Sequence, residues 1–267
     1  MPFVSLDSLP STGNASIDAD HQQIGEIING IYDRWQHGET CTAIKPKLEE
    51  LYQAIRRHFA KETIISRGAG YDNWEMHRTL HQDFLGRFEN FVLACKTGEN
   101  VNIDMFLDFE RHLFEHEVAF DQEMWKLWGD TSGGDKSVLI TWRPDYSVGV
   151  EQIDMQHRRL IDMVNDLYRD LDSMAGGSAI QERLKSIYME AMFHFRSEEQ
   201  YFSSLPAEEA ETHKMSHEAL LSELSAALKE HALAEVEKVR ALLEGYVKYW
   251  LLDHIVHVDS QLKAHLR

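Results

Sequence analysis

Apolar residues recur every three or four positions along most of the chain, which is the spacing of one face of an α-helix. In the first half these stripes cover residues 17–31, 48–62, 74–91 and 106–120. In the second half they cover residues 153–167, 180–198, 210–224 and 239–255. Long runs of strand-like alternation are absent from the sequence. The pattern therefore predicts an all-α protein whose amphipathic helices face a bundle core.

The polar stretch GDTSGGDKS, which begins at Gly129, interrupts the helical pattern near the middle of the chain. Such a composition is typical of a flexible linker. The length of 267 residues fits two domains of roughly 130 residues, each large enough for its own core. We therefore expect an up-down-up-down four-helix bundle in residues 1–128, a Gly-rich linker in 129–138 and a second such bundle in 139–267.

Seven polar residues lie on the apolar stripes, or at their flank, in the same order in each half. In the first half they are His21, His58, Glu62, His77, His81, His116 and Asp121. In the second half they are His157, His194, Glu198, His213, His217, His254 and Asp259. The first five members of the two sets are offset by 136 residues, as His21 and His157 are, and the last two by 138. This recurrence indicates a tandem duplication of a metal-binding domain.

Polar side chains on an apolar stripe need a partner. A buried imidazole or carboxylate without one costs on the order of 1–3 kcal/mol, and several in one small core would unfold it. A lone histidine of this kind is usually a satisfied core residue or a solvated one, and that interpretation stays open for any single position. For fourteen positions repeated in register, metal ligation is the better explanation, because one metal pair satisfies a whole set.

The spacing within each set suits shared ligation. His58 and Glu62, like His77 and His81, are four residues apart and project to the same side of a helix. Asp121 follows His116 by five residues, so it flanks the strict stripe, and only its recurrence in the second half brings it into the set.

The donor types restrict the metal. Imidazole and carboxylate ligands suit Fe, Mn, Zn or Cu. The number of ligands favours a pair of octahedral iron ions, because a structural zinc needs only four ligands, usually including cysteine. Five histidines and two carboxylates are less anionic than the ligand sets of carboxylate-rich di-iron bundles. Such a site favours reversible oxygen binding over strong oxidation.

Composition excludes several partner classes. The formal net charge of −18 argues against nucleic acid and anionic membrane surfaces, which need a basic face. No apolar run approaches the roughly 18 residues that cross a bilayer, and the start MPFVSLDSLP lacks the pattern of a secretory signal. Cys41 and Cys95 are not spaced as a metal or redox motif, so we expect small, half-buried thiols. A reducing cytoplasm is the expected location.

The arrangement H…HFxxE…HxxxH…HxxxxD resembles hemerythrin in its bacterial form, bacteriohemerythrin. The resemblance covers essentially the whole chain, once per half. It includes an Ile-Asp-x-x-His segment at residues 17–21 and 153–157, and a His-Phe-x-x-Glu segment at residues 58–62 and 194–198. A pattern of seven ligands over this length is highly specific.

This resemblance implies a non-haem di-iron centre in each bundle, two irons per domain and four per chain. One iron of each centre would take three histidines and the other two, with an open position for oxygen on the latter. Two carboxylates and an oxo or hydroxo group would bridge the irons. The three-histidine groups would be His77, His81, His116 and His213, His217, His254; the two-histidine groups His21, His58 and His157, His194; and the bridges Glu62, Asp121 and Glu198, Asp259.

The resemblance also implies that Trp250, Leu251 and Ile255 line an apolar oxygen pocket in the second domain. The first domain departs from the second at four aligned positions, with Leu6 for Trp142, His112 for Trp250, Glu117 for Ile255 and Thr63 for Glu199. Glu117 could ligate the open iron or hydrogen-bond a bound oxygen species, or it could point to solvent. His112 is expected to support a ligand from outside the metal shell.

We therefore expect a protein that binds molecular oxygen for carriage, storage or sensing. The alternative is a di-iron enzyme whose first domain turns over peroxide or nitric oxide with acid–base help from Glu117 and His112. A third hypothesis is iron or redox sensing with an unidentified protein client, although the sequence contains no visible output domain.

Overall fold

The computed structural model describes residues 3–9, 11–97, 102–119, 124–125, 127, 138–173, 177–230, 235–261 and 263. The chain divides into two compact units, Met1–Ser132 and Gly133–Arg267. The described residues form helices and turns and include no strand, which confirms the all-α prediction. Apart from Val138, the expected linker at residues 129–138 lies outside the described residues.

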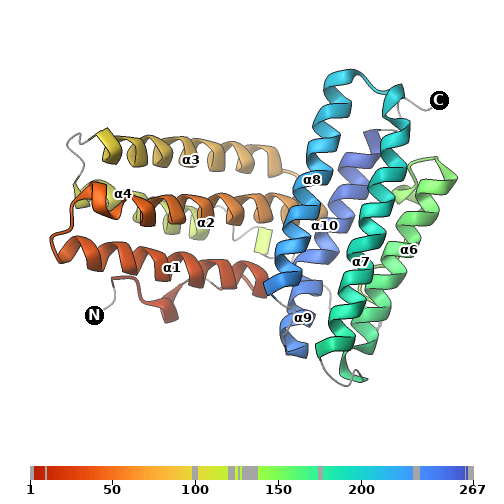
Figure 1. The fold of residues 1–267 in the computed structure, drawn as a ribbon, viewed down its shortest axis with the longest axis horizontal. Helices are drawn as coiled ribbons and strands as arrows, with labels where there is room; N and C mark the ends of the chain where they lie inside the picture. Colours follow the sequence, from red (N-terminus) through yellow and green to blue (C-terminus); the bar gives the residue numbers. More distant parts are fainter. Residues whose placement is uncertain are drawn as a thin grey trace. The chain divides into compact units, whose positions relative to one another are not determined.

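The first unit is a bundle whose helices have nearly parallel axes (Figure 1). Its elements are α1 (Ala15–Gln36), α2 (Cys41–Gly68), α3 (Trp74–Thr97) and α4 (Ile103–Ala119). The predicted apolar stripes lie on these helices and meet in one core. Ile28, Ile55, Phe88 and Phe106 contribute to it, one from each helix, and each is at most 1% exposed.

The second unit follows the same plan with a less regular last helix (Figure 1). Its first three helices are α6 (Glu151–Asp170), α7 (Gly177–Glu198) and α8 (Ala207–Glu230). The last helix consists of α9 (Val236–Leu242), a π-helical segment (Leu243–Val247), α10 (Lys248–Asp253), a second π-helical segment (His254–Val258) and a 3₁₀ turn (Asp259–Gln261).

The second π-helical segment explains the position of Asp259. A π-helix joins residues five apart, whereas an α-helix joins residues four apart. Here the backbone N–H of Asp259 donates to the carbonyl of His254. The wider turn therefore brings these two side chains to the same side of the helix, although their spacing does not fit the helical period of the rest of the stripe.

An asparagine on the first helix of each unit holds the segment that precedes the bundle. The Asn29 side chain accepts from the Val4 N–H at 2.7 Å and donates to the Val4 carbonyl at 2.9 Å. Asn165 does the same for Ile140, at 2.9 and 2.8 Å. Both residues of each pair are offset by 136 positions, the offset of the histidines, so the same contact recurs in the two units.

The aspartate of each Ile-Asp segment makes a second recurring contact. Asp18 accepts from the backbone N–H of Thr12 at 2.7 Å, and Asp154 accepts from that of Val148 at 2.8 Å. Each aspartate thus satisfies a buried N–H immediately before its helix, and fixes the start of the helix that carries the first histidine of the set.

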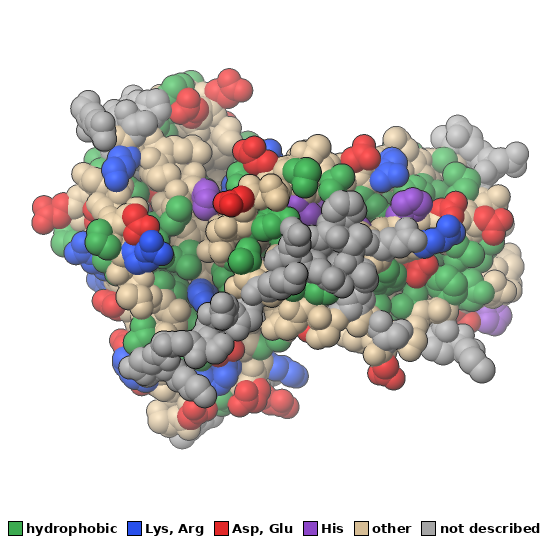
Figure 2. Space-filling view, turned by 180° about the vertical axis from the view of Figure 1, so that it is seen from behind, with side chains coloured by type: hydrophobic (Ala, Val, Ile, Leu, Met, Phe, Trp, Pro, Cys, Tyr) green, Lys and Arg blue, Asp and Glu red, His purple; other side chains and the backbone are tan. Residues whose placement is uncertain are grey.

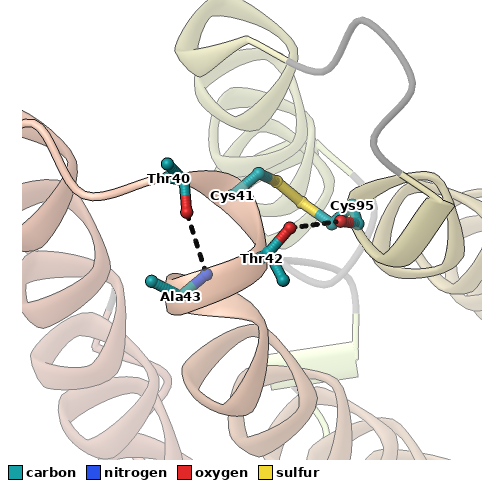
Figure 3. The surroundings of a disulfide bond; sticks show 5 residues. All are labelled: Thr40, Cys41, Thr42, Ala43 and Cys95. Carbon is teal, nitrogen blue, oxygen red and sulfur yellow. Dashed lines mark hydrogen bonds between the residues drawn. A yellow bond between two sulfur atoms is a disulfide. The ribbon is translucent and has the colours of Figure 1, made fainter.

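The cysteines are paired, so the prediction of two free thiols is wrong. Cys41 at the start of α2 forms a disulfide with Cys95 near the end of α3 (Figure 3). The antiparallel packing of these helices brings the two Cα atoms to 5.3 Å, within the range that a disulfide spans. Thr42 donates to the Cys95 carbonyl at 3.4 Å in the same place. Tertiary packing rather than a local motif creates this pair.

None of the helices that the structure describes has the length and apolar character needed to cross a membrane. On the face seen in Figure 2, acidic and basic side chains are interspersed over both units. The excess of acidic residues behind the net charge of −18 is therefore not gathered into one block on this face.

Candidate metal centres

All seven polar residues of the second set lie buried in the core of the second unit. They come from each of its helices in turn: His157 from α6, His194 and Glu198 from α7, His213 and His217 from α8, and His254 and Asp259 from the last helix. None is more than 3% exposed. The bundle therefore collects residues that are 102 positions apart in sequence, such as His157 and Asp259, into one dry site.

The seven side chains form two groups whose potential ligand atoms lie within 4.8 Å of one another. The first group contains Glu198, His213, His217, His254 and Asp259. The second contains His157, His194 and Asp259. The first group thus contains three histidines and the second contains two. Asp259 belongs to both groups.

Asp259 joins the groups through its two oxygens. Its Oδ1 lies 2.9 Å from Nε2 of His254 and 3.3 Å from Nε2 of His213. Its Oδ2 lies 2.9 Å from Nε2 of His157 and 3.7 Å from Nε2 of His194. Each oxygen therefore faces one group, as a carboxylate that bridges two cations does.

Glu198 also faces the histidines of the second unit. Its Oε2 is 3.2 Å from Nε2 of His217, 3.7 Å from that of His213 and 3.8 Å from that of His254. The same oxygen is 3.9 Å from Nε2 of His194, in the other group. Glu198 therefore also reaches both groups.

Several of these buried atoms face each other without hydrogen-bond geometry. They include Nε2 of His213, His217 and His254, both carboxylate oxygens of Glu198 and Oδ1 of Asp259. Lone pairs that converge in a dry core are destabilising unless a cation lies between them. Five imidazoles and two carboxylates offer the nitrogen and oxygen donors that iron accepts. The residues present thus fit a pair of iron ions.

The electrostatics of the site also favour cations. Burial alone would lower the pKa of His254, but the charges of Asp259 and Glu198 raise it above its ordinary value. Burial alone would raise the pKa of Asp259, but the charge of His254 and the hydrogen bond with His157 hold it well below its usual range. Asp259 is therefore held in the anionic form, which attracts metal ions.

Aromatic rings pack against two of the histidines in the second unit. Phe195 stacks on His217 with ring centroids 4.1 Å apart and planes 8° apart, and its ring lies 4.8 Å from that of His254. The three residues of the expected oxygen pocket, Trp250, Leu251 and Ile255, are each at most 2% exposed. These three side chains are thus removed from bulk water.

The first unit brings together the members of its set that the structure describes. Glu62 is fully buried, and its Oε2 lies 3.6 Å from Nε2 of His58 and 3.4 Å from that of His81. The Nε2 atoms of His77 and His116 are 3.1 Å apart, and these two residues form one group with His81. The ring of His21 lies 4.9 Å from that of His58. Asp121 lies outside the described residues.

Three residues at which the first unit departs from the second are His112, Glu117 and Thr63. His112 is exposed, and its Nδ1 lies 2.6 Å from the backbone carbonyl of Asp108 one turn earlier. Its counterpart Trp250 is buried. Glu117 lies within α4, but its side chain is outside what the structure describes. Thr63 donates to the Phe59 carbonyl at 2.9 Å.

The structure adds contacts behind the ligands that the stripes did not predict. In the first unit Oδ2 of Asp20 lies 3.7 Å from Nδ1 of His58, and its Oδ1 accepts from Lys61 at 2.8 Å. Burial would raise the pKa of Asp20, but His58 and Lys61 lower it below its ordinary value. The available sequence signal was position: Asp20 directly precedes His21, and Lys61 directly precedes Glu62.

Comparison with known proteins places residues 148–266 in the hemerythrin HHE cation binding domain, a match that includes all seven residues of the second set. Bacteriohemerythrin of Pseudomonas aeruginosa is 33% identical over 106 residues, 40% of this chain and 69% of the relative. Bacteriohemerythrin of Stenotrophomonas maltophilia is 31% identical over 134 residues, 48% of this chain and 84% of the relative. The hemerythrin-like protein of Naegleria gruberi is 27% identical over 125 residues, 47% and 92% of the two chains. No solved structure matches the chain significantly.

Proposed function

Because this chain belongs to the hemerythrin family, we propose that it binds molecular oxygen at a pair of iron ions in each of its two units. The observation that carries this proposal is the arrangement in the second unit, where seven buried side chains form two groups that share Asp259. Such a donor set has no simpler explanation in an apolar core, because most of its polar atoms face one another. Carriage, storage and sensing of oxygen all follow from the same binding step.

In the second unit one iron would be held by the three-histidine group and the other by the two-histidine group. Glu198 and Asp259 reach both groups and would bridge the ions, with an oxo or hydroxo group as a third bridge. When bound, the iron pair would supply the electrons for reversible oxygen binding. The three-histidine group is His213, His217 and His254, and the two-histidine group is His157 and His194.

We extend the proposal to the first unit by the recurrence of its contacts. Its helices place His77, His81 and His116 together, as the corresponding helices of the second unit do with their three histidines. The asparagine and aspartate contacts before the first helix recur at the offset of 136 residues. By this correspondence His21 and His58 would hold the second iron, and Glu62 and Asp121 would bridge.

The protein itself would hold the metals and keep water away. Trp250, Leu251 and Ile255 are buried on the last helix and would line an apolar pocket beside the second iron pair, where a small apolar molecule is favoured over water and ions. Phe195 packs against His217 and limits the movement of its ring. The enzymatic alternative depends on His112 and Glu117. The exposure of His112 does not favour a role at the metal centre, and oxygen binding is therefore the proposed function.

Optical spectroscopy of the iron-loaded full-length protein tests this function. The protein is reduced without oxygen, exposed to oxygen, and returned to an oxygen-free atmosphere. We expect a new absorption band that appears with oxygen and disappears on its removal over repeated cycles. Steady consumption of added peroxide without a reversible band would contradict oxygen binding and favour the enzyme.

A further inference from the structure

The two units differ in what lies behind one corresponding histidine. In the first unit a carboxylate of Asp20 faces Nδ1 of His58 at 3.7 Å, and both side chains are at least four-fifths buried. In the second unit the neutral amide oxygen of Gln156 faces Nδ1 of His194 at 3.3 Å. Asp20 and Gln156 occupy the same position of the repeat, because they are offset by 136 residues.

The next contact outward differs in a matching way. Lys61 donates to Asp20 at 2.8 Å in the first unit. At the same position of the repeat, Ser197 accepts from the Gln156 amide at 3.1 Å. The charged pair Asp20–Lys61 is thus replaced as a unit by the neutral pair Gln156–Ser197.

A third difference concerns the histidine group on the other side of the centre. In the second unit Oε1 of Glu199 lies 3.3 Å from Nδ1 of His217. The corresponding residue of the first unit is Thr63, whose hydroxyl donates to its own helix. The outer carboxylate therefore lies behind a two-histidine group in the first unit and behind a three-histidine group in the second.

An outer carboxylate changes the histidine that it contacts. When one ring nitrogen binds a metal, the other nitrogen carries a proton that a neighbouring acceptor can draw toward itself. An anionic acceptor makes the imidazole a stronger electron donor than a neutral amide does, and a stronger donor stabilises the more highly charged state of the metal. Lys61 moderates this effect, since its positive charge offsets part of the charge of Asp20.

We propose that Asp20, held by Lys61, is a positioning residue that strengthens His58 as a metal ligand and makes the first centre harder to reduce. The second unit gives His194 only the neutral amide of Gln156. This inference rests on the proposed di-iron centre in the first unit. It assigns the two units different redox properties at the iron with the open position, and so different tendencies to keep bound oxygen.

The test is a spectroelectrochemical titration of the iron-loaded full-length protein, with iron content measured for each variant. Asp20→Gln places the natural second-unit residue in the first unit, so it is compatible with the fold. We expect it to shift the ferric-to-ferrous ratio of one centre toward the ferrous state by about tenfold at a given potential. A tenfold shift corresponds to a rise of about 59 mV for a one-electron step.

Two further variants separate charge from packing. Lys61→Ser removes the charge that moderates Asp20, so it should lower the potential of the same centre. Gln156→Asp should lower the potential of the other centre and leave the first unchanged. Disturbed packing alone would not shift the reduction potential of the first centre in opposite directions in Asp20→Gln and Lys61→Ser.

The outcomes distinguish the two proposals. Full iron content with opposite shifts for Asp20→Gln and Lys61→Ser supports the role of Asp20. Full iron content with unmoved potentials, or with both variants shifted in the same direction, overturns it and leaves the proposed function standing. A wild-type protein that binds no iron in its first unit overturns both the role of Asp20 and the proposed di-iron centre of that unit.

Discussion

Neighbouring residues of the last helix meet very different surroundings. Ile255 follows His254 and is 1% exposed, whereas Val256 is 36% exposed. Tolerance of a charge should therefore change abruptly between these two positions. The contrast gives a matched pair of substitutions one residue apart.

We predict that Ile255→Glu destabilises the second unit by on the order of 3 kcal/mol and shortens the life of its oxygenated form, because it buries a carboxylate beside the metal ligands. Val256→Glu should change the stability of the second unit by less than about 0.5 kcal/mol, since its side chain reaches solvent. It should leave the lifetime of the oxygenated form unchanged within experimental error. Thermal unfolding and the decay of the oxygenated absorption band measure the two effects. Equal effects of the two substitutions would show that Ile255 does not face the site.

The sequence predicted those site residues that recur with the helical period. The buried histidines and glutamates recur on the apolar stripes, so spacing alone placed them together. Asp20 and Gln156 lie one position off those stripes, where a polar residue usually meets solvent. Their contacts depend on the packing of the first helix of each unit against the second, which spacing along one helix does not contain.

At the scale of elements, the helices followed the predicted stripes and the exceptions have physical causes. Asp259 belongs to the site because its helix widens into a π-helical turn, which a period of 3.6 residues does not anticipate. The disulfide joins the start of α2 to the end of α3 across 54 residues. Only the antiparallel packing of the two helices reveals that pair.

The disulfide should stabilise the first unit alone. Closing a loop of 54 residues restricts the unfolded chain by about 4 kcal/mol in the chain-entropy model. We predict that Cys95→Ser lowers the free energy of unfolding of the first unit by up to about this amount and leaves the second unit unchanged.

Denaturant titration of the full chain, followed by signals assigned to each unit, measures this effect. A reducing agent should have the same effect on the wild type and no further effect on Cys95→Ser. A wild-type protein whose unfolding is insensitive to reduction would contradict the prediction.

In the whole molecule, each unit has its own buried apolar residues and its own cluster of side chains that could hold a metal. We predict that His58→Ala removes the iron of the first unit and lowers its melting temperature, because the remaining buried ligands lose the cation that satisfies them. The second centre should keep its iron and its spectrum. The matched substitution His194→Ala should give the reverse pattern. Loss of both centres in either variant would contradict the independence of the units.

Two sets of seven ligands would hold two di-iron centres in this chain, and analysis of the bound metal measures how many are present. Full-length protein produced with ample iron is purified, and its iron and zinc are measured against protein concentration. Two centres of two ions each predict close to four iron ions per chain and little zinc. A content near two iron ions would contradict the centre in one unit, and full occupancy by zinc would contradict the di-iron account of both.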